Sequence, residues 1–252
     1  RRPPAEPSVQ GGGSQVLGPG AVVARRLISS DDGLPDDSLD ASDLFGQALA
    51  RLGDLDGDGL DGLARGIQDF EWTGGLSAGP PIEGAVLVLF LGSDGELDRF
   101  QRIDNHSPGF AGALGVGDRF GAALAPLRDL DGDGVPDLAA GTAMDCGNCE
   151  TLHVLFLNAD GSVKSFVRHP GFQSFSLARL GDLDGDGAPE LALGERDDAP
   201  SSRGAVEILF LAADGSVRAR RKIDETQGGF TGGLAAQAQC GSSVAGLGDL
   251  DG

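Results

Sequence analysis

Short apolar runs recur along the chain, and each ends close to a tight polar turn. The clearest runs span 85–91, 152–157 and 205–211, where nearly every residue is apolar. An Asp-Gly pair follows each run within a few residues, and this dipeptide favours a hairpin because Gly supplies the positive φ. We expect the segments after these turns to return as antiparallel strands, namely Glu96–Ile103, Ser162–Arg168 and Ser216–Ile223. Near-continuous apolar runs of this length are typical of strands that are covered on both faces.

An acidic segment precedes each apolar run and repeats almost the same residues. The copies are FGQALARLGDLDGDGLDGLARG at 45–66, FGAALAPLRDLDGDGVPDLAAG at 120–141, FSLARLGDLDGDGAPELALG at 175–194 and CGSSVAGLGDLDG at 240–252. The acidic runs recur at roughly 50 to 75 residues, a period that fits a multi-strand unit better than a short solenoid coil. One unit reads strand, acidic loop, strand, loop, strand, Asp-Gly turn, strand. The sequence therefore predicts an all-β fold of four-stranded antiparallel units, the plan of β-propeller blades, which must pack on one another.

The acidic loops have the pattern expected of a cation site. Carboxylates at alternate positions can converge on one ion, Gly at the sixth position allows the sharp turn, and the next carbonyl can supply a further oxygen. The ninth position is an acid in loops two and three but is Gly62 in loop one, where the neighbouring Asp61 is the substitute. The predicted metal ligands are Asp54, Asp56, Asp58, Leu60 and Asp61 in loop one; Asp129, Asp131, Asp133, Val135 and Asp137 in loop two; Asp182, Asp184, Asp186, Ala188 and Glu190 in loop three; and Asp249 and Asp251 in loop four.

The ligand types favour calcium. Oxygen donors without a partnering His or Cys suit a hard cation, Ca²⁺ before Mg²⁺. An EF-hand is excluded, because its loop needs a Glu at position twelve and flanking helices, whereas position twelve is Arg65, Ala140 or Leu193. The alternative is an Asp-Gly turn that holds no metal, but near-identical copies between apolar strands favour Ca²⁺ as the cofactor.

Composition and charge narrow the class of protein further. The chain has 252 residues with 43 Gly and 13 Pro, and its formal net charge is −20. This charge disfavours nucleic acid as a partner, since phosphate binding needs clustered Lys and Arg. No stretch approaches the length of a membrane-spanning helix. Residues 1–20 are rich in Pro and Gly and predict a disordered arm or linker, and the start at Arg1 and the end at Gly252 inside a loop predict a fragment or processed chain.

At this point the repeats resemble the FG-GAP repeats of integrin α-subunits and of their bacterial and algal relatives. The matching residues are Phe45-Gly46, Phe120-Gly121, the three acidic loops and the Leu-Ala-x-Gly that follows each loop. The resemblance covers about residues 21–252 and implies a propeller, commonly of seven blades, with Ca²⁺ in the loop between strands one and two. About three to four blades would be present here, with 21–29 as the last strand of a preceding blade. Gln173-Ser174 and Cys240-Gly241 depart from the family by replacing Phe-Gly.

A partner is expected on the rim opposite the acidic loops. Hairpin alternation places the acidic loops and the Asp-Gly turns on one rim, and the loops 67–83, 142–150 and 195–203 on the other. The first of these loops carries the partner-binding candidates Asp69, Phe70 and Trp72, since aromatic residues are favoured interface anchors. The alternative is that Trp72 packs over the end of a blade. A protein or glycan ligand is the expected partner, beside neighbouring blades or subunits that complete the propeller.

Three smaller motifs complete the sequence-based interpretation. Cys146 and Cys149 predict a local disulfide in an exposed loop, which fits an extracellular protein. Asn105 opens a glycosylation sequon. The G-x-S-x-G match at 75–79 lacks the helix that a catalytic Ser needs, because two Pro residues follow it. The sequence therefore predicts a secreted or cell-surface binding or adhesion protein and no enzyme; the alternative is an accessory propeller of a secreted hydrolase whose catalytic module lies outside this chain.

Overall fold

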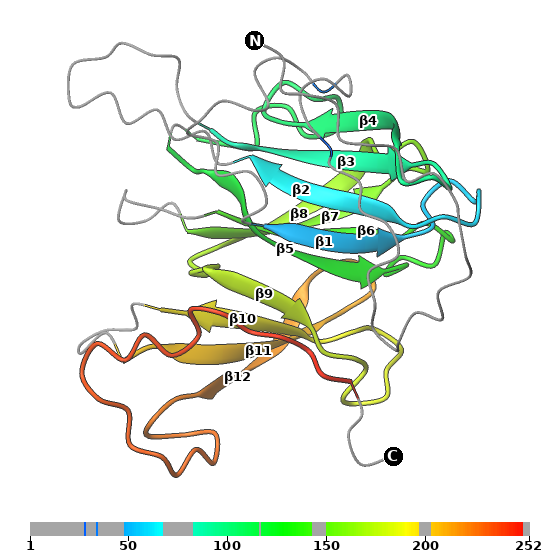
Figure 1. Ribbon diagram of the computed structural model, residues 1–252. Helices are drawn as coiled ribbons and strands as arrows, with labels where there is room; N and C mark the ends of the chain where they lie inside the picture. The colour runs from blue at the N-terminus through cyan, green and yellow to red at the C-terminus, as the bar shows by residue number, and fades with distance from the viewer. Residues whose placement is uncertain are drawn as a thin grey trace, which may run out of the picture.

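The computed structural model describes residues 28, 34, 48–67, 83–115, 117–142, 150–196 and 203–248. Every regular element in these ranges is a β-strand, and the strands form three four-stranded sheets (Figure 1). Blade one contains β1 (Leu49–Gly53), β2 (Gly62–Ile67), β3 (Ala85–Leu91) and β4 (Leu97–Ile103). Blade two contains β5 (Phe120–Arg128), β6 (Asp137–Thr142), β7 (Thr151–Leu157) and β8 (Val163–Pro170), and blade three contains β9 (Ser176–Arg179), β10 (Leu191–Glu195), β11 (Ala205–Leu211) and β12 (Val217–Ile223).

Strands within each blade pair in chain order, and every pair is antiparallel. The predicted all-β fold of propeller-type blades is therefore confirmed. The three apolar runs are the third strands, β3, β7 and β11, and the segments after the Asp-Gly turns return as β4, β8 and β12. The described residues contain no helix long and apolar enough to cross a membrane.

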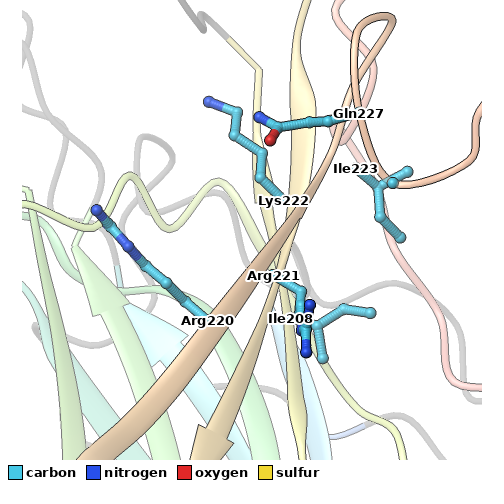
Figure 2. Close-up of a pocket in the computed structure, with 7 residues that line it drawn as sticks. Ile208, Arg220, Arg221, Lys222, Ile223 and Gln227 are labelled. Atoms are coloured by element: carbon cyan, nitrogen blue, oxygen red, sulfur yellow. The ribbon is translucent and has the colours of Figure 1, made fainter.

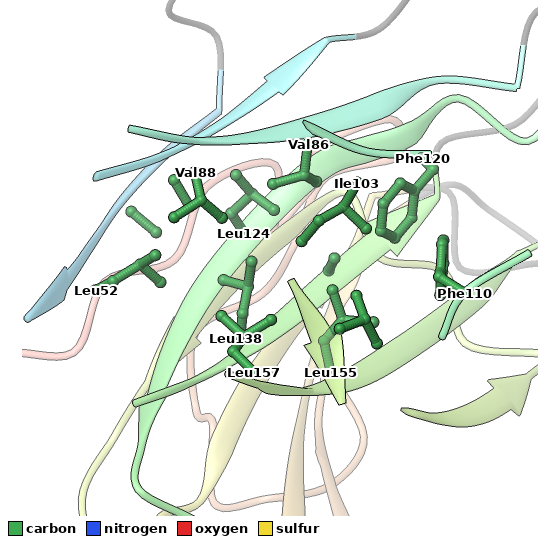
Figure 3. Packing of buried hydrophobic residues seen from close by; sticks show 14 of the residues in the cluster. Leu52, Val86, Val88, Ile103, Phe110, Phe120, Leu124, Leu138, Leu155 and Leu157 are labelled. Carbon is green, nitrogen blue, oxygen red and sulfur yellow. The ribbon is translucent and has the colours of Figure 1, made fainter. Parts of the chain in front are cut away.

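The three blades lie face to face, with the first strands of blades two and three against the blade before them. β5 contacts β1, β2 and β3, and β9 contacts β5 and β6. Val86 and Val88 of blade one meet Leu138 and Leu155 of blade two in one apolar cluster (Figure 3). A second cluster joins blades two and three through residues such as Val154. All seven residues of β7 are buried, because this strand lies between two neighbouring blades.

The Asp-Gly turns are also contacts between blades, a role that the sequence did not reveal. Gly161 has a φ of 81° and is buried; a Cβ on it would lie 3.0 Å from Cγ1 of Val88 and 3.2 Å from Cβ of Gln101. The turn of blade two therefore sits on β3 and β4 of blade one. The Asp-Gly turn of blade three is likewise fixed to blade two, because His169 Nε2 of β8 donates a hydrogen bond to the Gly215 carbonyl oxygen at 2.8 Å. Gly at this position serves both the hairpin and the packing of the blades.

The segments that open units two and four, Phe120-Gly121 and Cys240-Gly241, begin on the preceding blade. The Phe120 amide donates to the Glu83 carbonyl at 2.8 Å, and Phe120 forms a parallel bridge with Gly84. The Cys240 amide donates to the Arg203 carbonyl at 2.8 Å and bridges Gly204 in the same way. Cys240 therefore occupies in unit four the position that Phe120 occupies in unit two. Its thiol is free and half-buried.

Several predictions fall on residues outside the described ranges. These are the arm at 1–20, Phe45-Gly46, the partner-binding candidates Asp69, Phe70 and Trp72, the pair Cys146 and Cys149, and the loop-four ligands Asp249 and Asp251. Of the predicted strand at 21–29 only Ile28 is described, and it packs with Leu34 against a cluster that includes Leu87 and Leu89.

Candidate metal loops

The three acidic loops connect the first and second strands of their blades, as predicted, and the first aspartate folds each loop. In loop two Asp129 Oδ1 accepts hydrogen bonds from the amides of Gly132 at 2.7 Å and Asp133 at 2.9 Å. Its Oδ2 accepts from the Gly134 amide at 2.8 Å. The corresponding carboxylates of Asp54 and Asp182 accept from the matching glycine amides of their own loops. One carboxylate therefore satisfies several backbone donors and curls the chain around itself.

The curl brings the other carboxylates together. Three acids in each loop offer oxygen atoms that all lie within 4.8 Å of one another: Asp54, Asp56 and Asp58; Asp129, Asp131 and Asp137; and Asp182, Asp184 and Glu190. Residues that are up to eight positions apart in sequence thus present their oxygens to one small volume. Such crowding of negative charge is unfavourable unless positive charge compensates it.

The ninth-position acid of loop two is buried and hydrogen-bonded. Asp137 is 1% exposed, and its carboxylate accepts from the amides of Leu130 at 2.8 Å and Leu157 at 3.1 Å. These bonds join the loop to β7. Burial raises the pKa of Asp137 to about 6, and the nearby carboxylates of Asp131 and Asp133 raise it as well, against the two amide bonds. The raised pKa means that the negative charge lacks compensation in this environment.

The ninth-position acid of loop three has an oxygen without a partner. Glu190 is fully buried, and its Oε2 accepts from the Leu183 amide. Its Oε1 is buried and has no hydrogen-bond partner in the described part of the chain. Burial raises the pKa of Glu190, although the Leu183 amide opposes this effect, and the carboxylates of loop three raise the pKa further. A buried carboxylate oxygen without a hydrogen-bond donor is costly unless a cation binds it.

The donor set of loops two and three therefore fits a hard divalent cation. The carboxylates converge, no nitrogen or sulfur donor belongs to the groups, and Glu190 presents an oxygen that such an ion would satisfy. Loop one differs from the other two. Asp61, its predicted substitute ligand, is exposed and accepts a hydrogen bond from Arg51 Nε at 2.6 Å, apart from the group formed by Asp54, Asp56 and Asp58.

Basic side chains from the last strand of each blade contact the loops, and sequence reasoning missed them. Arg99 of β4 pairs with Asp56 at 2.7 Å. Lys164 of β8 pairs with Asp131 at 2.6 Å and Asp133 at 2.5 Å, and the corresponding residue of β12 is Arg218, which pairs with loop three. The signal was present in the repeat, because Lys164 and Arg218 each lie four positions after the Asp of the Asp-Gly turn.

Asn105 lies in the segment between blades one and two. Its side-chain oxygen accepts a hydrogen bond from the Leu114 amide at 2.9 Å, and the residue is half-buried. The side chain therefore supports the loop that carries Phe110 into the interface between blades one and two.

A hollow of about 490 Å³ lies on the face of blade three that points away from blade two. Ile208 and Arg221 line it together with neighbouring residues of β12 and of the loop after it (Figure 2). Ile208 and Arg221 occupy the repeat positions of Val88 and Gln101. In blade one, Val88 and Gln101 contact Gly161 in the Asp-Gly turn of blade two. The hollow therefore corresponds to the seat that an Asp-Gly turn fills on each of the earlier blades.

The fold and the loops together define a protein built from propeller-type blades with an acidic loop between the first and second strands. Residues 129–193, which contain loops two and three, match the family model described as FG-GAP-like repeat. The repeats of this chain are of the FG-GAP-like, integrin α-like type.

Three curated relatives are integrin α-subunits. The chain is 31% identical over 225 residues to Integrin alpha-7 of Homo sapiens, covering 85% of this chain and 18% of the relative. It is 29% identical over 168 residues to Integrin alpha-PS2 of Drosophila melanogaster, covering 60% of this chain and 11% of the relative. It is 35% identical over 109 residues to Integrin alpha pat-2 of Caenorhabditis briggsae, covering 43% of this chain and 8% of the relative. The matches thus span less than a fifth of the relatives' own lengths.

Proposed function

We propose that the chain is a calcium-binding, extracellular β-propeller segment that serves adhesion, binding of a protein or glycan, or structural assembly. The observation that carries this proposal is the buried Glu190, whose Oε1 has no partner among the described residues and belongs to a group of converging carboxylates. The similarity to integrin α-subunits supports the adhesive and extracellular role. This role is one of binding and not of catalysis.

Calcium would act here as a structural cross-link. The proposed ligands are those predicted from the sequence, and loops two and three carry the full set, including the buried acids Asp137 and Glu190. A bound ion supplies positive charge that compensates the clustered carboxylates. Because Asp137 also accepts from the Leu157 amide, ordering loop two would stabilise the middle of blade two.

Calorimetric titration with Ca²⁺, paired with thermal melts in Ca²⁺ and in chelator, tests the proposal. We expect saturable binding and a higher melting temperature in Ca²⁺, because ligand binding to the folded state alone stabilises it. Asp131→Asn combined with Asp184→Asn should abolish most of this gain. Asp98→Asn removes an exposed acid of β4 outside the loops and serves as the control. A folded wild-type chain that binds no Ca²⁺ would refute the proposal.

The partner-binding role proposed for Asp69, Phe70 and Trp72 rests on the sequence. An aromatic anchor beside acidic residues suits a protein or glycan ligand. Binding of wild-type protein and of Trp72→Ala to a glycan array and to a panel of purified extracellular proteins would test it. Equal binding of the two proteins to every ligand that is recognised would remove Trp72 from the proposed site.

A further inference from the structure

Acidic loops two and three each have a basic side chain brought to them by a β-bulge in the last strand of their own blade. In blade two Leu157 pairs with Val163 while Phe156 pairs with Ser165, so that Lys164 is the extra residue of the bulge. In blade three Leu211 pairs with Val217 while Phe210 pairs with Ala219, which makes Arg218 the extra residue. A bulge re-aims the side chain of its extra residue away from the regular alternation. Lys164 and Arg218 both use this freedom to reach an acidic loop.

These bases contact carboxylates that are among the predicted metal ligands. Lys164 Nζ lies 2.6 Å from Oδ2 of Asp131 and 2.5 Å from Oδ2 of Asp133. Arg218 Nη2 lies 3.0 Å from Oδ2 of Asp184 and 2.5 Å from Oδ2 of Asp186. In each loop one nitrogen therefore bridges the second and third aspartates.

Blade one shows that the interaction persists when the bulge residue changes. There the bulge position is Asp98, and the next residue, Arg99, reaches Asp56 through Nη2 at 2.7 Å. A basic contact thus recurs in all three described loops although the residue and its position differ. Loop one, whose ninth position lacks an acid, has a single contact of this kind, whereas loops two and three have two each.

We propose that Lys164 and Arg218 are internal counter-cations that hold the metal-free loops closed and that a divalent ion must displace, so that they set the affinity of the loops for metal. This inference rests on the proposed function. An ammonium that bridges two carboxylates compensates their charge when no ion is bound. A divalent ion has to compete with that contact, and it then binds beside a positive charge that repels it.

The two bases differ in how firmly they are held. Arg218 Nε also donates to the Leu211 carbonyl oxygen at 3.0 Å, which fixes the guanidinium beside loop three. Lys164 has a single ammonium on a flexible stem, and its side chain regains rotamer freedom when it leaves the loop. Lys164 is therefore the better residue on which to test displacement.

The test compares Lys164→Met with the wild type in a background in which loop two alone can bind. Asp56→Asn and Asp184→Asn disable loops one and three, and circular dichroism checks that each protein is folded. Lys164→Met keeps the length of the side chain but removes its charge. We expect the Ca²⁺ dissociation constant of loop two to fall about three- to tenfold and the melting temperature in chelator to fall as well. Lys164→Arg should restore both values towards those of the background protein.

A matched control separates a local effect from a change in net charge. Lys222 of β12 pairs with Glu195 at 3.0 Å, outside the acidic loops. Lys222→Met therefore alters the net charge equally, and we expect it to leave the dissociation constant of loop two unchanged. If the background protein binds no Ca²⁺, the proposed calcium function is wrong. If it binds Ca²⁺ but Lys164→Met changes neither the affinity nor the melting temperature in chelator, the counter-cation role alone is wrong.

Discussion

The carbonyl oxygen of Gly121 lies where a side chain on Gly66 would have to be, 1.8 Å from the position of a Cβ on that residue. Gly66 belongs to β2 of blade one, and Gly121 follows Phe120 at the start of β5 of blade two. The backbones of the two blades thus meet without any side chain between them. Gly194 of blade three meets Gly241 of the following unit in the same way, with a Cβ-to-oxygen distance of 1.9 Å. Glycine at these positions is a requirement of the contact between blades.

We predict that Gly66→Ala destabilises the chain by about 1–3 kcal/mol, the range expected when added atoms force packed groups apart. Gly62→Ala on the same strand is the matched control, because its Cβ would lie 3.5 Å from the nearest atom, an ordinary contact. Urea unfolding of both variants in saturating Ca²⁺ measures the difference. Equal stability of the two variants would show that the blades can separate at Gly66 without loss.

The repeated Leu-Ala-x-Gly and Phe-Gly segments were visible in the sequence, but their mutual contact was not. Periodic apolar runs and Asp-Gly turns predicted the strands well, because both are local signals; β3 and β11 have the predicted bounds. Contact between Gly66 and Gly121 joins two units and depends on how blades stack, which no local pattern encodes. Unit three illustrates this, because it lacks the Phe-Gly pair and yet keeps the contact: buried Ser174 occupies the position of Gly121 and packs against Gly141.

Loop one offers a gain-of-function prediction. Gly62 occupies the position that Asp137 fills in loop two, and the amides of Leu55 and Leu91 stand at the repeat positions of the two donors to Asp137. We expect Gly62→Asp to raise the Ca²⁺ affinity of loop one about tenfold or more, since it adds a carboxylate to Asp54, Asp56 and Asp58.

Calorimetry in the background Asp131→Asn and Asp184→Asn would isolate loop one for this measurement. Gly62→Ala is again the control, because it fills the same space without a carboxylate. No gain in affinity for Gly62→Asp over Gly62→Ala would argue that the ninth-position acid is not a ligand.

In loop three we expect the effect of Glu190→Gln on stability to differ between the metal-free and the metal-bound protein. Glu190→Gln replaces a buried carboxylate whose Oε1 has no partner among the described residues. In chelator we expect the variant to be as stable as the wild type or more stable, because a buried charge next to Asp182 and Asp184 is removed. In Ca²⁺ we expect it to lose the stabilisation that loop three contributes, because a ligand charge is missing.

Thermal melts of Glu190→Gln and wild type under both conditions give the comparison. Glu195→Gln, at the end of β10 and outside the loop, controls for the loss of one acid from the same strand region. A loss of stability of Glu190→Gln that is equal in chelator and in Ca²⁺ would indicate that Glu190 serves packing alone.

The candidate ligands were largely predictable, and their surroundings were not. Alternate aspartates and the acid at position nine form a contiguous pattern, so Asp129, Asp131 and Asp137 could be grouped from sequence, and they do converge. The pairing of Lys164 with Asp131 joins residues of different hairpins and depends on a bulge in β8. The sequence also placed Asp61 among the ligands, whereas its carboxylate lies with Arg51. Which carboxylates pair with basic residues depends on three-dimensional proximity, and the spacing of the acids along the sequence does not predict it.

Blade two contains a buried histidine that makes a prediction about acid stability. His153 is fully buried among Phe110, Phe120 and Phe166, with ring centroids 5.5, 5.4 and 6.3 Å away. Neither ring nitrogen has a hydrogen-bond partner in the described part of the chain. Burial lowers the pKa of His153 to about 4, with smaller contributions from Arg168 and His169.

The sign of the pH effect follows from this lowered pKa. Between the ordinary pKa of histidine near 6.5 and the value of about 4 in the fold, the unfolded chain binds a proton at His153 and the folded chain does not. Stability from this residue is therefore complete above pH 6.5 and is lost as the pH falls towards 4, by about 3 kcal/mol in total.

Leu87 occupies the same repeat position in blade one, so we expect His153→Leu to fold and to lack this part of the pH dependence. Urea unfolding of wild type and variant from pH 7.5 to 4.5 under identical conditions cancels the titration that both proteins share. The two stability curves should diverge as the pH falls below 6.5, with the variant the more stable in acid. Parallel curves would show that His153 binds a proton as readily in the fold as in the unfolded chain, which requires acceptors for its ring N–H groups.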